Sequence, residues 1–213
     1  MINNRINKLV SKFNKYDIDG YIIPKNDEFF SEYSANDRLK AISNFSGSAG
    51  YSIILKNKNY LFVDGRYTIQ AKKEAGKNFQ IIDFHKIINC NLFKNLSIGF
   101  NPKFFTSVQI KKFFNKHNKV KSIESNLIDQ IHKSKIKSNK PFFSLKSKVV
   151  GENYKTKIIK IRKYLNKNKS DYLFVTAPEN VAWLLNIRGH DNPNSPIPNC
   201  HLIIDNKSSF YLI

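Results

Sequence analysis

Two glycines that precede an apolar run have a spacing that could form a phosphate-binding loop. Gly47 and Gly50 lie in "SGSAG", directly before "YSIILK". A glycine-rich loop binds phosphate when it leads into the N-terminus of a helix, where free backbone amides face the anion. Here the loop leads into a strand-like run, and no Gly-Lys-Ser or Gly-Lys-Thr follows. We therefore interpret Gly47 and Gly50 as a tight structural turn that allows close backbone approach.

The sequence "DGRY", residues 64–67, is the second candidate site. Asp64 and Gly65 fit a turn at the end of a strand, with Gly65 at positive φ. Arg66 and Tyr67 would then begin a helix, where the helix dipole disfavours a cation. An arginine in such a place needs a carboxylate partner, and the candidates in the chain are Asp64, Glu32 and Asp37. A contact of Arg66 with a substrate or another domain is the alternative.

The other reactive side chains form no recognisable catalytic set. The chain has five histidines, namely His85, His117, His132, His190 and His201. None belongs to an HExxH or similar metal-ligand pattern, and the chain has no GxSxG motif. Cys90 and Cys200 form no CxxC pair, so we expect free thiols. His190 and Asp191 are adjacent, but two residues do not make a metal site. We expect no catalytic residue and no metal site.

The net charge of +20 in 213 residues raises the question of an anionic partner. Basic surfaces attract nucleic acids and anionic membranes without specificity. Only five of the 36 basic residues are arginine, which does most bidentate recognition of phosphate and bases. The lysines are spread along the whole chain, and lysine, asparagine, isoleucine and phenylalanine are all abundant. We interpret the charge as compositional drift and expect neither a specific nucleic-acid partner nor a membrane partner.

The spacing of apolar residues predicts helices alternating with strands. Apolar residues at helical spacing predict an amphipathic helix over 3–16. "YSIILK" and "NYLFVD", separated by "NKN", predict a β-hairpin. Further helices are expected over "RYTIQAKKEA", over "TSVQIKKFFNKH", with Val108 on its packed face, and over 154–168. Strands are expected at "DGYIIP", "FQIIDF", "LSIGFNP" and "VKSIES". The pattern predicts an α/β fold, a mixed sheet with flanking helices.

A lysine- and serine-rich stretch divides the chain. We predict a first domain over 1–135, a linker over 136–152 and the start of a second domain over 153–213. In the second domain, Trp183, Leu184 and Leu185 lie in an apolar run that would be buried in a complete domain.

The second domain repeats the first. A helix, an Asp-initiated strand and an apolar hairpin recur in the same order. Asp19 precedes Ile53 by 34 residues, and Asp171 precedes Ile203 by 32. The second copy stops inside the hairpin's second strand, so we expect it to be incomplete.

Two long segments resemble one known family. "DGYIIPKNDEFFSEYSANDRLKAISNFSGSAG", continuing to "YLFVDGRYTIQA", and "ENVAWLLNIRGHDNPNSPIPNCHLII" resemble the N-terminal domains of Xaa-Pro aminopeptidases. These are the three-domain aminopeptidase P type of the creatinase/prolidase superfamily. The match covers nearly the whole chain in order. Phe62 and Val63 stand where the family usually has Trp and Thr, and Ser195 stands where it usually has Asn.

The resemblance implies a creatinase N-terminal-type domain followed by an incomplete second copy. In the family, a catalytic domain with two Asp, one His and two Glu binds two divalent metals, Mn or Zn. That domain has no counterpart here, so the resemblance implies an inactive chain whose parent removes an N-terminal residue preceding proline. It also implies that such domains restrict access to the catalytic domain and contribute to a homodimer. The implied contacts with substrate or another domain are Asp64, Arg66, Tyr67, Arg188 and Asp191.

We expect a cytoplasmic protein, because the first twenty residues lack the apolar stretch of a signal peptide. Two other functions stay open. The chain could be a free-standing non-catalytic scaffold or partner protein, or a basic nucleic-acid-binding module.

Overall fold

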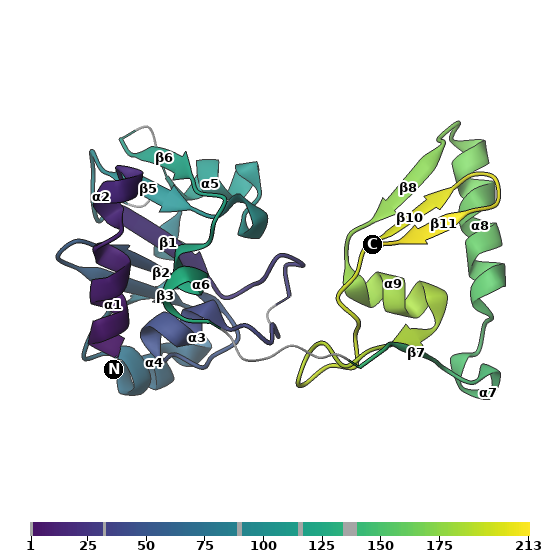
Figure 1. Cartoon of the computed structure of the whole chain (residues 1–213), viewed down its shortest axis with the longest axis horizontal. Helices are drawn as coiled ribbons and strands as arrows, with labels where there is room; N and C mark the ends of the chain where they lie inside the picture. The colour runs from purple at the N-terminus through teal and green to yellow at the C-terminus, as the bar shows by residue number, and fades with distance from the viewer. Residues whose placement is uncertain (1, 32, 89–90, 115–116, 134–139) are drawn as a thin grey trace. The chain divides into compact units, whose positions relative to one another are not determined.

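The chain folds into two compact units in a computed structural model (Figure 1). The first unit comprises Met1–Glu28 and Asn36–Lys135, and the second comprises Phe29–Ala35 and Ile136–Ile213. The structure describes residues 2–31, 33–88, 91–114, 117–133 and 140–213. The domain boundaries at 135 and 153, with a linker between, stay a prediction.

A six-stranded mixed sheet forms the centre of the first unit, in the order β4-β3-β2-β1-β5-β6. Its strands are β1 (Gly20–Pro24), β2 (Gly50–Leu55), β3 (Asn59–Val63), β4 (Gln80–Asp83), β5 (Ser97–Phe100) and β6 (Lys119–Ser122). β1, β2 and β3 pair antiparallel, whereas β4, β5 and β6 each pair parallel to their neighbour. The predicted hairpin is therefore confirmed as β2 and β3.

Helices cover both faces of this sheet (Figure 1). The α-helices are α1 (Ile2–Val10), α2 (Phe13–Tyr16), α3 (Arg38–Ser43), α4 (Thr68–Ala75), α5 (Ser107–Phe113) and α6 (Leu127–Ile131). Short 3-10 helices are η1 (Gly65–Tyr67), η2 (Phe84–Ile87) and η3 (Pro102–Phe104). Successive strand residues point to opposite faces. Tyr21 and Ile23 therefore enter the core with α1, α3 and α6, and Ile22 enters the core with α5.

Two local predictions in the first unit need correction. The helix expected over 3–16 is two helices, because the chain turns at Ser11 and Lys12 between α1 and α2. Val108 was expected on the packed face of α5, but it is exposed. A capping box between Thr106 and Gln109 sets the start of α5, and this start turns Ile110 and Phe113 inward instead.

A three-stranded antiparallel sheet forms the second unit, in the order β11-β10-β8. Its elements are α7 (Ser147–Val150), α8 (Tyr154–Lys167), β8 (Tyr172–Val175), α9 (Pro178–Leu185), β10 (Leu202–Asp205) and β11 (Phe210–Leu212). A separate pair joins β7 (Phe143–Ser144) to β9 (Ile187–Arg188). Ile158 of α8 and Leu184 of α9 pack with Leu202 and Ile204 of β10.

The internal repeat is reproduced in the strand register. Ile22 of β1 lies opposite Ile53 of β2, and Phe174 of β8 lies opposite Ile203 of β10. The order β3-β2-β1 in the first unit thus corresponds to β11-β10-β8 in the second. The α/β class with a mixed sheet and flanking helices is confirmed.

The apolar run in α9 is only partly buried. Leu184 and Leu185 are buried, whereas the Trp183 side chain is 61% exposed. The inward stripe of α9 also contains Val181, and Trp183 points away from that stripe. Across the described residues, no helix combines the length and the apolar character that crossing a bilayer requires.

Candidate functional site

The glycine turn before β2 depends on close packing. A Cβ atom on Gly47 would lie 2.2 Å from the Phe45 ring, which is fully buried. A Cβ atom on Gly50 would lie 2.8 Å from the backbone oxygen of Phe62 on the neighbouring strand. The turn leads directly into β2 and not into a helix. It therefore lacks the helix N-terminus that a phosphate loop uses.

Gly65 does not behave as predicted. It has no positive φ, whereas Gly151 does, with φ of 66°. A Cβ atom on Gly65 would meet nothing within 4 Å. The Asp64 side chain accepts a hydrogen bond from the Arg66 backbone amide at 3.0 Å and so caps η1. This cap forms the turn without a left-handed residue.

Arg66 lies beside the acid that precedes it. Its Nε donates to Oδ1 of Asp64 at 2.9 Å, and its guanidinium lies 5.4 Å from the centre of the Tyr67 ring. The side-chain hydrogen bond from Arg66 lowers the pKa of Asp64, and the backbone hydrogen bond adds to this effect. Of the other proposed partners, Asp37 pairs with Lys25, and Glu32 lies outside the described residues. The Arg66 side chain is 72% exposed.

Tyr67 connects this turn to the glycine turn. Its hydroxyl lies 2.9 Å from Oγ of Ser48, and its ring meets the Phe45 ring edge-on, 5.8 Å between centres. Asp64, Arg66 and Tyr67 are therefore fixed against the segment that holds Gly47 and Gly50.

A second polar network borders the same turn. The Glu74 carboxylate accepts hydrogen bonds from the Ser46 backbone amide and hydroxyl, both at 2.8 Å, and from Gln70 at 3.0 Å. Burial raises the pKa of Glu74, but these hydrogen bonds outweigh it and leave the pKa lowered. The sequence analysis missed Glu74. The available signal was the spacing of Gln70 and Glu74, four residues apart on one helix face.

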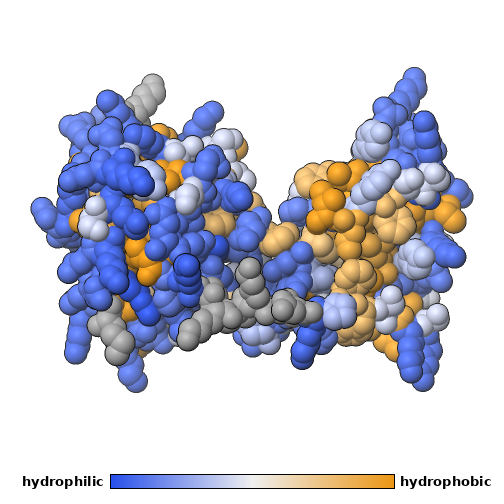
Figure 2. Space-filling view, in the orientation of Figure 1, coloured by the Kyte–Doolittle hydropathy of each residue, from blue (hydrophilic) through white to orange (hydrophobic). Residues whose placement is uncertain are grey.

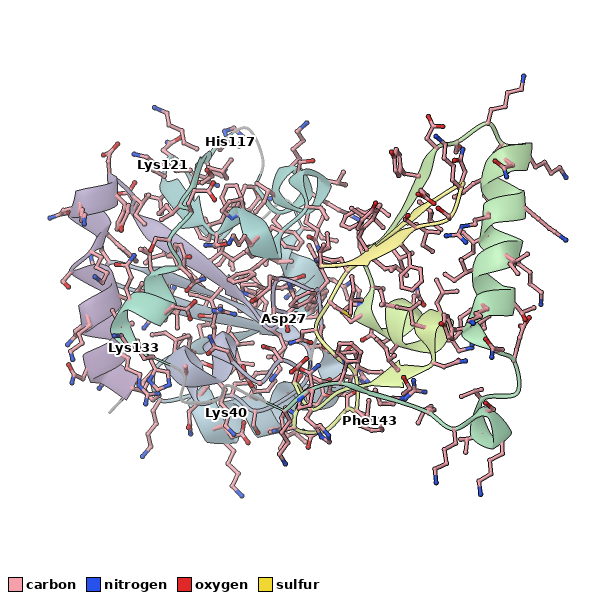
Figure 3. All side chains as sticks on the ribbon, turned by 45° about the vertical axis from the view of Figure 1, so that its right-hand side comes forward. Asp27, Lys40, His117, Lys121, Lys133 and Phe143 are labelled. Atoms are coloured by element: carbon pink, nitrogen blue, oxygen red, sulfur yellow. The ribbon has the colours of Figure 1, made fainter. Side chains whose placement is uncertain are left out.

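A partly buried ion pair joins α3 to α6. Nε and Nη2 of Arg38 donate to the two carboxylate oxygens of Asp129, each at 2.9 Å, and the guanidinium lies 4.5 Å from the centre of the Phe104 ring. Figure 3 labels Asp27, which is buried, and the exposed Lys40 of α3. The sequence analysis did not single out Arg38 as a site residue, because its partner lies 91 positions away.

Arg188 and Asp191, the two predicted site residues of the second unit, form hydrogen bonds with backbone atoms of the loop that contains them. Nη1 of Arg188 donates to the backbone oxygen of Ile187 at 2.8 Å, and the Asp191 carboxylate accepts from the Asn199 backbone amide at 2.8 Å. The same loop borders an open hollow of about 530 Å³, lined by Lys140, Gly189, His190, Asn192, Pro193, Asn194, Ser195 and Pro196. The structure thus engages Arg188 and Asp191 with the backbone of their own loop, and it does not bring them together into a catalytic pair.

Lys157 is a buried cation that the sequence analysis missed. Its Nζ donates to the backbone oxygen of Trp183 at 2.6 Å and to Oδ1 of Asn186 at 2.7 Å. Burial lowers the pKa of Lys157; the charge of Glu152 opposes this shift, and that of Arg188 adds to it. The sequence contained a signal for this burial, because Lys157 occupies a position on the apolar side of α8.

The described residues do not fit a metal centre. In that part of the chain, no three His, Cys, Asp or Glu side chains lie together in a way that could hold a metal ion. Cys200 is buried, and Cys90 lies outside the described residues. The side chains of the described residues therefore offer no candidate metal centre.

Comparison with known proteins relates both units to one family. The sequence model described as "Creatinase/Prolidase N-terminal domain" matches residues 5–131, and a second model with the same description matches residues 132–213. The two matches adjoin and together cover all but the first four residues.

Curated relatives extend well beyond this chain. A probable Xaa-Pro aminopeptidase P of Laccaria bicolor is 32% identical over 210 residues, which is 91% of this chain and 33% of that protein. Xaa-Pro aminopeptidase 1 of Dictyostelium discoideum is 29% identical over 234 residues, which is 97% of this chain and 36% of that protein. The chain thus spans about a third of the length of the curated relatives it matches.

One solved structure matches the whole fold. The X-prolyl aminopeptidase of Caenorhabditis elegans, described as a cytosolic enzyme with a di-nuclear active site, superposes with a TM-score of 0.87 and 25% sequence identity. The match covers 100% of this chain and 38% of that one.

Proposed function

The chain belongs to the creatinase/prolidase N-terminal domain family, and we propose that it is the non-catalytic N-terminal portion of a metal-dependent Xaa-Pro aminopeptidase. The observation that carries this proposal is the order of two N-terminal domains along the sequence, together with the similarity of the chain, over its full length, to one X-prolyl aminopeptidase chain. The parent would hydrolyse the bond between an N-terminal residue and proline. Two divalent metals, Mn or Zn, would be held by its remaining part.

In this proposal the two units shape access to the catalytic part and contribute to assembly of a homodimer. Support comes from the exposed guanidinium of Arg66, which pairs with Asp64 and lies 5.4 Å from the centre of the Tyr67 ring. Such an exposed cation suits a contact with a carboxylate of a peptide or of another domain. Arg188 and Asp191 are the corresponding candidates in the second unit. A cytoplasmic location is proposed by analogy with the cytosolic Caenorhabditis elegans enzyme.

The proposal is tested by a chimera. This chain replaces the third of the Laccaria bicolor relative that it matches, and release of arginine from Arg-Pro-Pro is measured with added Mn²⁺ or Zn²⁺. We expect the chimera to be active, and this chain alone to be inactive with either metal. Chelator-sensitive activity of this chain alone would overturn the proposal. So would a folded but inactive chimera beside an active relative.

A further inference from the structure

A hollow lies between helix α1 and the turn that joins β2 to β3. Its volume is about 470 Å³, within the range of small-ligand sites in proteins. The Leu55 backbone amide donates to the Lys58 backbone oxygen at 2.9 Å and so closes this turn. We call this space the α1 hollow. It is lined by Asn3, Ile6, Asn7, Val10, Ser11, Leu55, Lys56, Asn57, Lys58 and Asn59.

The internal repeat relates Val10 of α1 to Arg162 of α8. Val10 precedes the aspartate before β1 by nine residues, and Arg162 precedes the aspartate before β8 by nine. The same count relates Ile6 to Ile158, and both of these side chains are buried. The two helices therefore turn equivalent positions toward their sheets.

In the second unit, an ion pair bridges the equivalent space. The Arg162 guanidinium donates to the backbone oxygens of Asp205 and Ser209 at 3.2 and 3.1 Å, and it lies 3.7 Å from the Asp205 carboxylate. Leu55 occupies the register position of Asp205, since each lies opposite the first residue of β1 or β8. In the first unit, the shorter and uncharged Val10 and Leu55 thus replace the ion pair, and an open hollow with apolar side chains remains.

The β2–β3 turn brings positive charge to the hollow. Lys56 pairs with Asp19 at 3.2 Å, but both side chains are partly exposed, so this pair is weak. Nζ of Lys58 lies 5.2 Å from the centre of the Tyr60 ring, and no carboxylate of the described residues pairs with it. The Lys58 ammonium can therefore bind an anionic group of a ligand.

Four asparagines give the hollow both hydrogen-bond donors and acceptors. Asn3, Asn7 and Asn57 are exposed, and the first two lie about one turn apart on α1. Nδ2 of Asn59 donates to the Asn78 backbone oxygen at 3.1 Å, whereas its Oδ1 is buried and has no partner among the described residues. A peptide backbone offers N–H and C=O groups together, and carboxamides match both. A phosphate offers acceptors alone.

The surroundings favour a small occupant over a broad apolar interface. The side of the first unit that Figure 2 shows is mostly hydrophilic, with apolar side chains only in small areas. Large docking surfaces are marked by contiguous apolar patches. A ligand that buries one apolar side chain and pairs its polar groups suits this unit better.

We propose that the α1 hollow binds the C-terminal residue of a peptide. An apolar last side chain packs on Val10 and Leu55, the α-carboxylate accepts from the Lys58 ammonium, and the backbone hydrogen-bonds to the asparagine carboxamides. Among the described residues that line the hollow there is no arginine, the side chain that matches phosphate best. The inference goes beyond the proposed function and does not depend on it, because every residue involved belongs to the first unit.

Fluorescence anisotropy with a labelled peptide tests this site. The probe is Gly-Gly-Gly-Leu with fluorescein on its N-terminus, and the comparison peptide is the same molecule with a C-terminal amide. We expect the free acid to bind this chain with a dissociation constant below about 1 mM at about 150 mM salt. The amide should bind at least about tenfold more weakly, because it lacks the charge that Lys58 pairs with. Inorganic phosphate at about 10 mM should displace little of the probe.

Three variants locate the binding. Lys58→Met removes the charge and should weaken binding of the free acid at least about fivefold. Lys8→Met is the matched control, since Lys8 is exposed on α1 and does not line the hollow, and it should leave binding unchanged. The double variant Val10→Arg with Leu55→Asp installs the pair that the second unit uses, and it should abolish binding. Urea unfolding shows that each variant is folded.

Five outcomes would overturn this proposal. They are no binding of the free acid below about 1 mM, equal binding of the acid and the amide, and full displacement by phosphate, which would identify a general anion site. The fourth is equal loss of binding in Lys58→Met and Lys8→Met, which would identify unspecific charge attraction. The last is undiminished binding by a folded double variant. Each of them leaves the proposed function intact, because the chimera tests that function separately.

Discussion

The ammonium group of Lys157 lies 4.0 Å from the centre of the Trp183 indole ring and donates to the backbone oxygen of the same residue at 2.6 Å. The second hydrogen bond of Lys157 reaches Asn186, the left-handed residue that ends α9. One buried cation therefore joins α8 to the C-terminal end of α9, where carbonyl oxygens carry partial negative charge.

Replacing Lys157 with methionine is expected to destabilise the second unit by about 1–3 kcal/mol, because two buried acceptors lose their donor. Trp183 is the only tryptophan in the chain, so its fluorescence during urea unfolding reports on this unit. Lys163→Met is the matched control, since Lys163 is exposed on the same helix, and it should change stability by less than about 0.5 kcal/mol. Equal stability of the two variants would contradict the structural role of Lys157.

The two glycine turns are expected to respond differently to substitution. Gly47→Ala should destabilise the first unit by about 1–3 kcal/mol, because the new methyl group displaces the buried Phe45 ring. Gly65→Ala should be tolerated, because its Cβ position is open. Urea unfolding followed by far-UV circular dichroism measures both. A larger loss for Gly65→Ala would show that the turn at Asp64 is not held as described.

Cys200 predicts a pH dependence of stability. Burial, together with the charge of Asp191, raises the pKa of this thiol from 9.0 to about 11. Between these values the unfolded chain loses the proton while the folded chain keeps it, so the free energy of unfolding falls as pH rises from 9 to 11. The measurement is urea unfolding at several pH values for the natural chain and for Cys200→Ala. In the alanine variant, the free energy of unfolding should fall less between pH 9 and 11. The same slope of this free energy against pH in both proteins would argue against a raised thiol pKa.

Local features of the fold were predictable from the sequence, and long-range features were not. The hairpin and the correspondence of Ile53 with Ile203 follow from period-two alternation and short turns, which a sequence displays directly. The pair of Arg38 with Asp129 depends on how distant segments pack, and no local pattern indicates it. Gly65 was misjudged because glycine after aspartate commonly marks a left-handed residue, whereas here the Asp64 side chain caps the turn.

The positive charge is expected to give only weak binding to nucleic acids. Figure 3 shows the side chains of Lys40 and Lys121 extending from different sides of the first unit, so these lysines do not form one stripe. Fluorescence anisotropy with short DNA and RNA strands should give dissociation constants weaker than about 10 µM at about 150 mM salt, without sequence preference. Tight binding at that salt concentration, with preference for one sequence, would favour the nucleic-acid-binding module.

The two units are expected to differ in their resistance to protease. In the first unit the central strands β1, β2 and β3 are buried on both faces, whereas the second unit has three strands and one exposed face with Tyr172, Phe174 and Tyr211. Each large apolar side chain left in water forfeits about 1.5–3 kcal/mol, a substantial part of the marginal stability of a domain. Low stability raises the population of opened states that a protease cleaves.

Trypsin should therefore cut first within 136–152, where lysines are frequent in the sequence, and then degrade residues 153–213 while a fragment of 1–135 persists. Mass spectrometry identifies the fragments, and the fluorescence of Trp183 follows the loss of the second unit. Chymotrypsin cuts after aromatic residues, which both units contain. It therefore serves as a control for the number of lysine sites that trypsin can cut in each unit. If 153–213 survives as long as 1–135 with both proteases, and the protein is monomeric, the second unit is a complete small domain and the exposed face does not limit its stability.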